Sequence, residues 1–266
     1  MDKNFKNILK KDKILFEKDG VFYFSAVPGD IKPSQDQNPE DMSRWSEWRK
    51  ENFNFFKEQL GNSEKGLILA DVGAGQSDFK ELVSGFNLVS VDFYPYSGIN
   101  VVCDFSSGLP FQDDALDIIL ISNVLEHIPE PDKFLKECFR TLKKGGVLLG
   151  SVPFMIGVHQ RPYDFYRYTD ISLKRLFGAC GFSEPKIEPV LGEHVLLFSI
   201  SARLFTNLAR KTRFSANSLL NAIAAVFVRV LWKLIRIGFW ALGPLFKKAQ
   251  RDADWPLGYL FKAIKT

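Results

Sequence analysis

Two glycines beside an aspartate occur where the chain could turn around a ligand. The run Asp71-Val72-Gly73-Ala74-Gly75 follows the apolar segment 66–70 and precedes apolar residues at helical spacing. This pattern predicts a buried strand, a tight turn and a helix, because glycine permits the turn and lets a ligand approach the backbone closely. The free N–H groups at the start of the helix would add hydrogen-bond donors. We therefore expect a nucleotide-like ligand at this turn.

The charges around the turn indicate which nucleotide-like ligand it would take. The third glycine of the dinucleotide-binding fingerprint is absent, because Asp78 stands in its place. Asp71 and Asp78 would repel a pyrophosphate, whereas they suit the ammonium and sulfonium groups of S-adenosylmethionine. This cofactor is therefore expected rather than a dinucleotide.

Two further acids complete the expected cofactor site. Asp92 ends a second apolar segment, about 20 residues beyond the glycine turn, where its carboxylate could accept both ribose hydroxyl groups. Phe93 follows it and is counted in the same site. Asp104 ends a third, shorter segment, where it could bind the adenine amino group while Phe105 packs on the ring. Together with Asp71, these acids are expected to line one edge of a parallel sheet.

With these residues and four further motifs, the chain resembles the class I S-adenosylmethionine-dependent methyltransferases, in particular the group that includes the ubiquinone-biosynthesis type. The further motifs are Leu109-Pro110-Phe111, 117–123, Leu125-Glu126-His127 and 142–146. The resemblance implies an α/β, Rossmann-like fold with helices on both faces of a mostly parallel, seven-stranded sheet. The implied strand order is 3-2-1-4-5-7-6, with strand 7 antiparallel. It also implies that Asn123 holds the methionine part of the cofactor.

A segment dense in polar and aromatic side chains, 159–168, follows the fifth predicted strand and could bind the acceptor. Methyl transfer requires alignment of a nucleophile and removal of its proton, so one base could suffice. His159 and His127 are the two candidate bases, and the choice between them stays open; packing beside the site is the alternative role for His127. The side chains expected to orient the substrate are Asp164, Tyr166 and Arg167; surface charge is the alternative for the arginine.

The run 162–169 is similar to a loop of methyltransferases associated with bacterial cell-surface polysaccharide synthesis. This resemblance implies O-methylation of a sugar or a lipid-linked glycan at the cytoplasmic face of the membrane. Two other functions stay open: a polyprenyl-quinone ring methyltransferase, and a non-catalytic, membrane-bound S-adenosylmethionine-binding protein. The acceptor and the methylated atom are not fixed by the sequence.

The chain is expected to have three parts. Its 266 residues, 46% of them hydrophobic, suffice for one main domain with an appendage. Apolar segments around Asp19-Gly20 predict a small β-hairpin preamble within residues 1–35. The methyltransferase part is expected at 41–194 and 255–266, beginning with a helix that either closes over the cofactor or packs as scaffold. An apolar helical insertion, 195–254, precedes the last strand.

The insertion combines aliphatic residues with cations. Ten Lys and Arg residues precede its first acid, Asp252, and Arg229, Lys233 and Arg236 fall on one helical stripe. This pattern is typical of a helix that lies on an anionic membrane surface. Its uncharged central run is shorter than the roughly 20 residues that a spanning helix needs. A cap over the site and a dimer contact are the alternatives, whereas nucleic acid is not expected.

Cysteine use and the first residues suggest a compartment. Cys103, Cys138 and Cys180 lack the spacing of disulfide or metal-ligand pairs and are expected to be reduced core residues, so no metal is predicted. No apolar leader follows Met1, which predicts a cytoplasmic protein, peripheral on the inner face of the membrane. The oligomeric state is left open.

Overall fold

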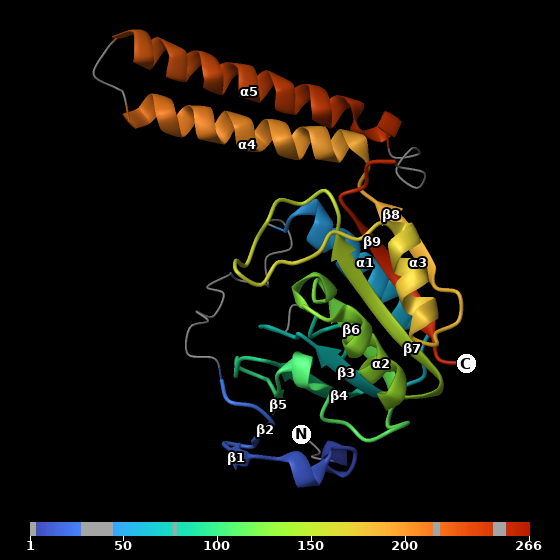
Figure 1. Cartoon of the computed structure of the whole chain (residues 1–266). Helices are drawn as coiled ribbons and strands as arrows, with labels where there is room; N and C mark the ends of the chain where they lie inside the picture. Colours follow the sequence, from blue (N-terminus) through green and yellow to red (C-terminus); the bar gives the residue numbers. More distant parts are fainter. Residues whose placement is uncertain (1–3, 28–44, 77–78, 215–218, 247–253) are drawn as a thin grey trace. The chain divides into compact units, whose positions relative to one another are not determined.

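The computed structural model has an α/β architecture built on one sheet (Figure 1). It describes residues 4–27, 45–76, 79–214, 219–246 and 254–266. The chain divides into two compact units, Met1–Glu188 with Tyr259–Thr266 as the first and Pro189–Gly258 as the second. The two units are described separately below.

The sheet has nine strands in the order β1-β2-β5-β4-β3-β6-β7-β9-β8. Pairing is parallel between β3 and both of its neighbours, between β4 and β5, and between β6 and β7. The strands are β1 (Phe16–Lys18), β2 (Val21–Tyr23), β3 (Ile68–Val72), β4 (Asn87–Asp92), β5 (Val101–Val102), β6 (Leu116–Ser122), β7 (Leu142–Pro153), β8 (Lys186–Val190) and β9 (Gly258–Ile264). Counted from β3, the strands outside β1 and β2 follow the order 3-2-1-4-5-7-6.

The prediction of seven strands is wrong, because the N-terminal hairpin joins the sheet. Asp19 and Gly20 both have positive φ, as the two-residue turn between β1 and β2 requires. Phe22 then pairs in parallel with Val101, so the hairpin extends the sheet instead of forming a separate preamble. The pairing covers the outer edge of β5, which would otherwise present unpaired backbone groups.

The last strand runs opposite to its neighbour β7. Gly145 N–H donates to the Lys265 carbonyl at 2.8 Å, and Lys265 N–H donates to the Gly146 carbonyl at 3.0 Å. The start of β7 therefore lies beside the end of β9. The ring of Phe261 on β9 is fully buried and packs on Phe177.

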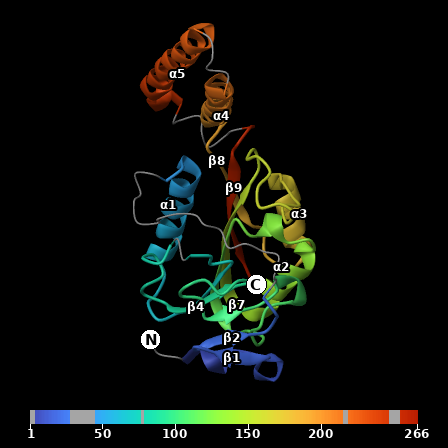
Figure 2. The same ribbon diagram turned by 90° about the vertical axis from the view of Figure 1, so that its left-hand side faces the viewer.

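Helices cover both faces of this sheet. Figure 2 shows α1 (Glu47–Gly61) on one face and α2 (Pro131–Thr141) and α3 (Asp170–Ala179) on the other. Ser46 caps α1, because its Oγ accepts the Arg49 N–H. Short 3-10 turns include η4 (Phe105–Ser107) and η5 (Leu125–His127). The turn η5 follows β6 and carries residues of the candidate site.

Two helix boundaries differ from the prediction. Residues 79–85 form successive turns rather than the helix expected after Gly75. Asp78 lies outside the described residues. The Lys143-Lys144-Gly145 run is typical of a helix end, but α2 already ends at Thr141 and β7 starts at once. The reason is that Gly145 already gives its N–H to β9.

The second unit is a pair of helices, α4 (Glu193–Phe214) and α5 (Leu219–Phe246). They contact each other through aromatic rings: Phe198 packs on Trp232 and Phe239, and Phe205 packs on Trp232. Large aliphatic side chains remain exposed on both helices, among them Leu197, Ile200, Leu204, Val230, Leu234 and Ile237. Within the described residues, no helix is both long and apolar enough to cross a membrane.

Candidate functional site

The glycine turn after β3 is tight and positioned by β4. Gly73 and Gly75 have φ values of +77° and +53°, a region that other residues rarely adopt. A Cβ on Gly73 would overlap the Cγ2 atom of Val124, so no side chain fits there. The N–H groups of Gly73 and Ala74 both donate to the Val91 carbonyl, at 2.8 and 3.1 Å. The turn is therefore fixed against the end of β4.

Asp92, the last residue of β4, connects the two strand ends. Its buried carboxylate accepts the Gly75 N–H at 2.9 Å and the Tyr94 N–H at 3.0 Å. Burial raises the pKa of Asp92 to about 6, although these N–H donors oppose the shift. A carboxylate has about four acceptor positions, so Asp92 retains capacity for two hydroxyl donors. Phe93 is half-buried and packs against the core.

A cavity of about 170 Å³ opens beside this turn. Its wall comes from α1, the β3 turn and the end of β6, and consists of Trp48, Arg49, Asn52, Asp71, Gly73, Ala74, Phe79, Ser122 and Asn123. Cofactor and drug-sized pockets usually occupy about 300–1,000 Å³, so this cavity would hold one end of a larger ligand. The sequence analysis named Asp71, Gly73 and Asn123 but missed the three residues from α1.

Asn123 is held in place by α1. It follows β6 with a positive φ of 54°, a conformation that asparagine tolerates better than most residues. Its Oδ1 accepts the indole N–H of Trp48 at 2.9 Å. Trp45, Trp48 and Phe56 recur at helical spacing in the sequence, and this aromatic stripe is the signal that could have placed α1 at the site.

Opposite charges share the cavity. Asp71 is buried at the end of β3, and Arg49 enters from α1 with its guanidinium over the Trp45 ring, 4.6 Å from the centroid. A carboxylate and a guanidinium in one small cavity suit a zwitterion that carries both an ammonium and a carboxylate.

Asp104 and Phe105 line a different cavity, of about 570 Å³. Asp104 caps η4, because its Oδ1 accepts the backbone N–H and the hydroxyl of Ser106 at 2.9 and 2.7 Å. Phe105 is buried and its ring lies 6.1 Å from that of Phe134. Among the described residues, neither side chain lines the smaller cavity.

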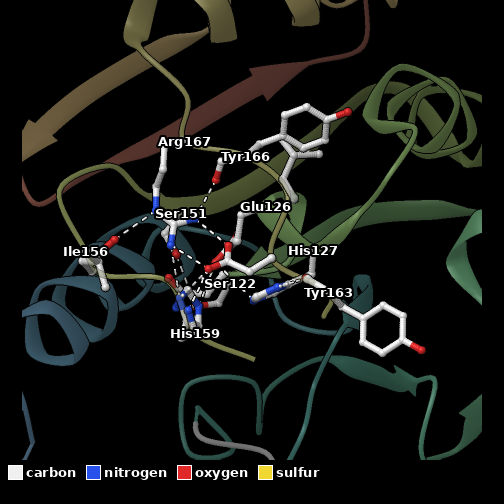
Figure 3. A network of polar contacts seen from close by, with 12 residues as sticks. Ser122, Glu126, His127, Ser151, Ile156, His159, Tyr163, Tyr166 and Arg167 are labelled. Atoms are coloured by element: carbon white, nitrogen blue, oxygen red, sulfur yellow. Dashed lines mark hydrogen bonds and ion pairs between the residues drawn. The ribbon is translucent and has the colours of Figure 1, made fainter. Parts of the chain in front are cut away.

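The loop after β7 is organised by an ion pair between Asp164 and Arg167. Figure 3 shows Arg167 beside Ile156 in this loop. Arg167 donates to both Asp164 oxygens, at 2.6 and 2.8 Å, and also to the carbonyl of Ile156. This guanidinium holds the pKa of Asp164 well below its usual range. The Tyr166 hydroxyl donates to the Pro129 carbonyl at 2.9 Å. All three residues expected to orient a substrate thus have their polar groups engaged within the protein, where they shape the loop.

The same loop brings both candidate bases to one buried carboxylate, that of Glu126 in η5. Glu126 Oε1 lies 3.6 Å from His127 Nε2 and 3.8 Å from His159 Nε2. The two imidazole rings meet edge to face with centroids 4.9 Å apart. Burial raises the pKa of Glu126 to about 8 and lowers the pKa of His127. The sequence analysis gave Glu126 no role, although an acid beside a histidine after a buried strand was a usable signal.

This cluster lies beside the 170 Å³ cavity. Ser122, at the end of β6, lines the cavity, and its Oγ is 3.3 Å from the Ser151 Oγ on β7. Glu126 follows Ser122 by four residues along the chain, and Figure 3 draws both serines in one view with Glu126 and His159. The Phe165 N–H donates to the Glu126 carbonyl at 2.9 Å, which fixes the loop to η5. A ligand in the cavity and a second molecule at the histidines would therefore be neighbours.

Comparisons with known proteins match the central part of the chain. Residues 70–150 match the family model of a methyltransferase domain. An uncharacterized methyltransferase of Mycobacterium leprae is 34% identical over 106 residues, covering 35% of this chain and 39% of the relative. A demethylmenaquinone methyltransferase of Bacillus pumilus is 29% identical over 125 residues, covering 44% of this chain and 53% of the relative. The chain thus spans about half or less of the length of these curated relatives.

Solved structures give weaker matches over more of the chain. Phosphoethanolamine N-methyltransferase 2 of Haemonchus contortus, in complex with S-adenosyl-L-methionine, has a TM-score of 0.49 and 17% identity, covering 81% of this chain and 52% of that one. An S-adenosylmethionine-dependent methyltransferase of Archaeoglobus fulgidus has a TM-score of 0.49 and 18% identity, covering 82% of this chain and 94% of that one.

Proposed function

We propose that this chain, whose residues 70–150 match a methyltransferase domain, transfers a methyl group from S-adenosylmethionine to a small-molecule or lipid-linked acceptor. The observation that carries the proposal is the Asp92 carboxylate, held by the Gly75 N–H where the glycine turn meets the end of β4. A carboxylate at this place can accept two ribose hydroxyls, and the preceding turn leaves no side chain in the way of the ligand.

The residues of the small cavity fit the other end of this cofactor. Its methionine part carries an ammonium and a carboxylate, for which Asp71 and Arg49 offer opposite charges. Asn123, fixed by Trp48, offers amide hydrogen bonds between them. When bound, S-adenosylmethionine supplies a methyl group on a sulfonium that is already a good leaving group. The protein then has to align the acceptor and receive its proton.

We propose that the acceptor binds at the histidines and presents a hydroxyl group, with a sugar on a lipid carrier as the first candidate. Three aromatic side chains of the loop, Tyr163, Phe165 and Tyr166, are partly exposed and could cover the face of a sugar ring. His159 and His127 would be the candidate proton acceptors for this hydroxyl. A neutral histidine is needed for that role, and burial lowers the pKa of His127 in the required direction.

The helix pair α4–α5 supports action at a membrane surface. Exposed aliphatic side chains accompany the exposed cations Arg229, Lys233 and Arg236 on α5. No acid lies between Glu193 and Asp252 to offset these charges. We therefore propose that this unit binds the headgroup region of an anionic membrane, where such helices are stabilised by both apolar burial and charge.

A second candidate function is methylation of a polyprenyl quinone. It is favoured by the match to the demethylmenaquinone methyltransferase of Bacillus pumilus. A quinone ring would use the same exposed aromatic side chains, and its lipid tail would use the same apolar helices.

Metabolite comparison separates these candidates. Lipid extracts of a wild-type and a deletion strain are compared for methylated glycan and methylated quinone. Loss of a methylated glycan supports the first candidate, and loss of a methylated quinone supports the second. If neither product changes while calorimetry still shows that the purified protein binds S-adenosylmethionine, the remaining hypothesis is a non-catalytic binding protein. If the protein does not bind this cofactor, the proposed function is wrong.

A further inference from the structure

We propose that Glu126, His127 and His159 form a binding site for one divalent transition-metal ion of the zinc type. A set of two imidazoles and one carboxylate is a common ligand set for such ions. The three donor atoms all lie within 4.8 Å of one another. The sequence analysis predicted no metal because cysteine spacing gave no sign of one. Ligands from two separate loops leave no such spacing.

The first observation is the isolation of the Glu126 carboxylate. The side chain is fully buried, and in the described part of the chain neither of its oxygens has a hydrogen-bond partner. A buried carboxylate without a partner is unfavourable, and native structures almost always pair such a group with a donor or a cation. Two histidine nitrogens lie within 4 Å of Glu126 Oε1, and the space between these three atoms is the place we assign to the missing partner.

The second observation is the orientation of His127. Its Nδ1 lies 2.6 Å from the Tyr163 carbonyl, which can only accept, so Nδ1 carries the proton and donates it. In the neutral ring Nε2 then carries a lone pair, which is directed at the Glu126 side chain. That atom is also buried without a hydrogen-bond partner among the described residues. A histidine that donates Nδ1–H to a carbonyl while Nε2 is free is the arrangement found in metal-ligating histidines.

His159 is oriented in a comparable way from the other side. Its Nδ1 lies 3.4 Å from an Asp164 oxygen and 3.3 Å from the Gly157 carbonyl, both of which can accept its proton, while the Asp164 side chain also accepts the His159 backbone N–H at 2.8 Å. These contacts direct Nε2 toward Glu126. Asp164 and Arg167 thereby act as positioning residues behind a ligand, which gives a reason for their pairing within the loop.

The separations suit a metal ion. Ligands at about 2.0–2.1 Å around a tetrahedral zinc are about 3.3–3.4 Å apart. The observed 3.6 and 3.8 Å from Glu126 to the two histidines exceed this separation by a few tenths of an ångström, and all three donor atoms lie within 4.8 Å of one another, so binding an ion requires the ligands to move closer together. His159 is one-third exposed, so one side of the site stays open to a further ligand. An oxygen of the acceptor is the ligand class that the open position would take. With the ion bound, neither Nε2 atom remains free to accept a proton, so the metal site and the histidine base of the proposed function are alternatives.

The part of the inference that concerns the acceptor rests on the proposed function, but metal binding does not, and it can be tested alone. Full-length protein is stripped with a chelator, and Zn²⁺ is titrated by calorimetry. We expect one ion per chain, with Glu126→Gln and His159→Ala each weakening the affinity by at least 10- to 100-fold. His194→Ala is the matched control, because it removes the third histidine of the chain from outside the cluster and should bind Zn²⁺ as the wild type does.

Two further readouts keep the test decisive. Zn²⁺ should raise the melting temperature of the wild type and of His194→Ala, but not that of Glu126→Gln, and circular dichroism establishes that the variant is folded. Affinity for S-adenosylmethionine should be equal in Glu126→Gln and wild type, so a failed metal site and a failed cofactor site are distinguishable. Absence of stoichiometric Zn²⁺ binding in the wild type, or unchanged binding in folded Glu126→Gln and His159→Ala, would overturn the proposal.

Discussion

Replacing Asp92 with alanine should weaken the binding of S-adenosylmethionine by roughly 30- to 150-fold. In the proposed complex the Asp92 carboxylate accepts two ribose hydroxyls, and alanine removes both acceptors. Hydrogen bonds to a charged group contribute about 1.5–3 kcal/mol net, and we take about 2–3 kcal/mol for the pair because the two share one carboxylate. At about 1.4 kcal/mol per factor of ten, this gives the stated range.

The structure predicts a second effect of the same change. Asp92 also accepts the N–H groups of Gly75 and Tyr94, and alanine leaves these donors without their partner. Each unpaired buried donor costs about 1–3 kcal/mol, so the variant should also melt at a lower temperature. Asp92→Asn keeps one oxygen acceptor and should lose less stability, while it still lacks the charge that strengthens the ribose contact.

Calorimetry on variants with native circular dichroism measures the binding effect separately from the stability effect. Asp132→Asn is the matched control. The substitution removes one exposed acid on α2 and so changes the net charge by the same amount. Its ion pair with Lys136 is long, at 4.0 Å, so its loss should have little effect on stability. Unchanged cofactor affinity in folded Asp92→Ala would refute the placement of the ribose. Tighter binding of NAD than of S-adenosylmethionine by the wild type would refute the choice of cofactor.

Three further predictions follow from named contacts. Because burial raises the pKa of Asp92 to about 6 and ribose binding needs its ionised form, cofactor affinity should fall by about tenfold in total as pH drops from 7 to 5. The same raised pKa means that this group favours the folded state at low pH, and that its contribution is lost as pH rises from about 4 to 6. Gly73→Ala should destabilise the fold by about 1–3 kcal/mol in denaturant unfolding, because its Cβ would overlap Val124. Changing Arg229, Lys233 and Arg236 together to Glu should abolish sedimentation with anionic vesicles, since each cation near the surface contributes about 1 kcal/mol.

Each of these predictions has its own control. For the pH effect, Asp92→Asn should bind weakly but without the change between pH 7 and 5; a parallel pH profile would place the titration elsewhere. For Gly73→Ala, the partner change Val124→Ala should restore part of the lost stability, and no recovery would contradict the overlap. For the vesicles, neutral phosphatidylcholine should retain neither protein, and equal retention of both proteins on anionic vesicles would contradict the role of charge.

The sheet was largely predictable because its strands are continuous apolar runs. β3, β4 and β6 are buried on both faces, so their residues alone mark them as central parallel strands. The Asp19-Gly20 turn was also visible in the sequence. That β2 would pair with β5 was not, because Phe22 and Val101 are distant in the chain and neither carries a local signal for its partner.

The site was predictable only where strand ends define it. Asp71 and Asp92 follow apolar runs, whereas Arg49 and Trp48 reach the cavity from a helix whose docking depends on tertiary packing. Asp164 and Arg167 were expected to bind a substrate, yet they form an ion pair with each other. The residue types alone do not predict whether such side chains pair within the protein or with a ligand. That the Glu126 oxygens have no hydrogen-bond partner within the described part of the chain likewise depends on how the loop packs on η5, which only the folded chain establishes.

The position of β9 has a consequence for how the protein is made. This strand lies between β7 and β8, but roughly 70 residues, including both helices of the second unit, are translated between β8 and β9. At about 5–20 residues per second, the ribosome needs on the order of 3–14 s to deliver the strand after β8 has emerged. During that interval the edge of β7 that later receives β9 is exposed, and the apolar helices are already outside the ribosome. Early engagement of those helices by a membrane or a chaperone would protect the nascent chain during this interval.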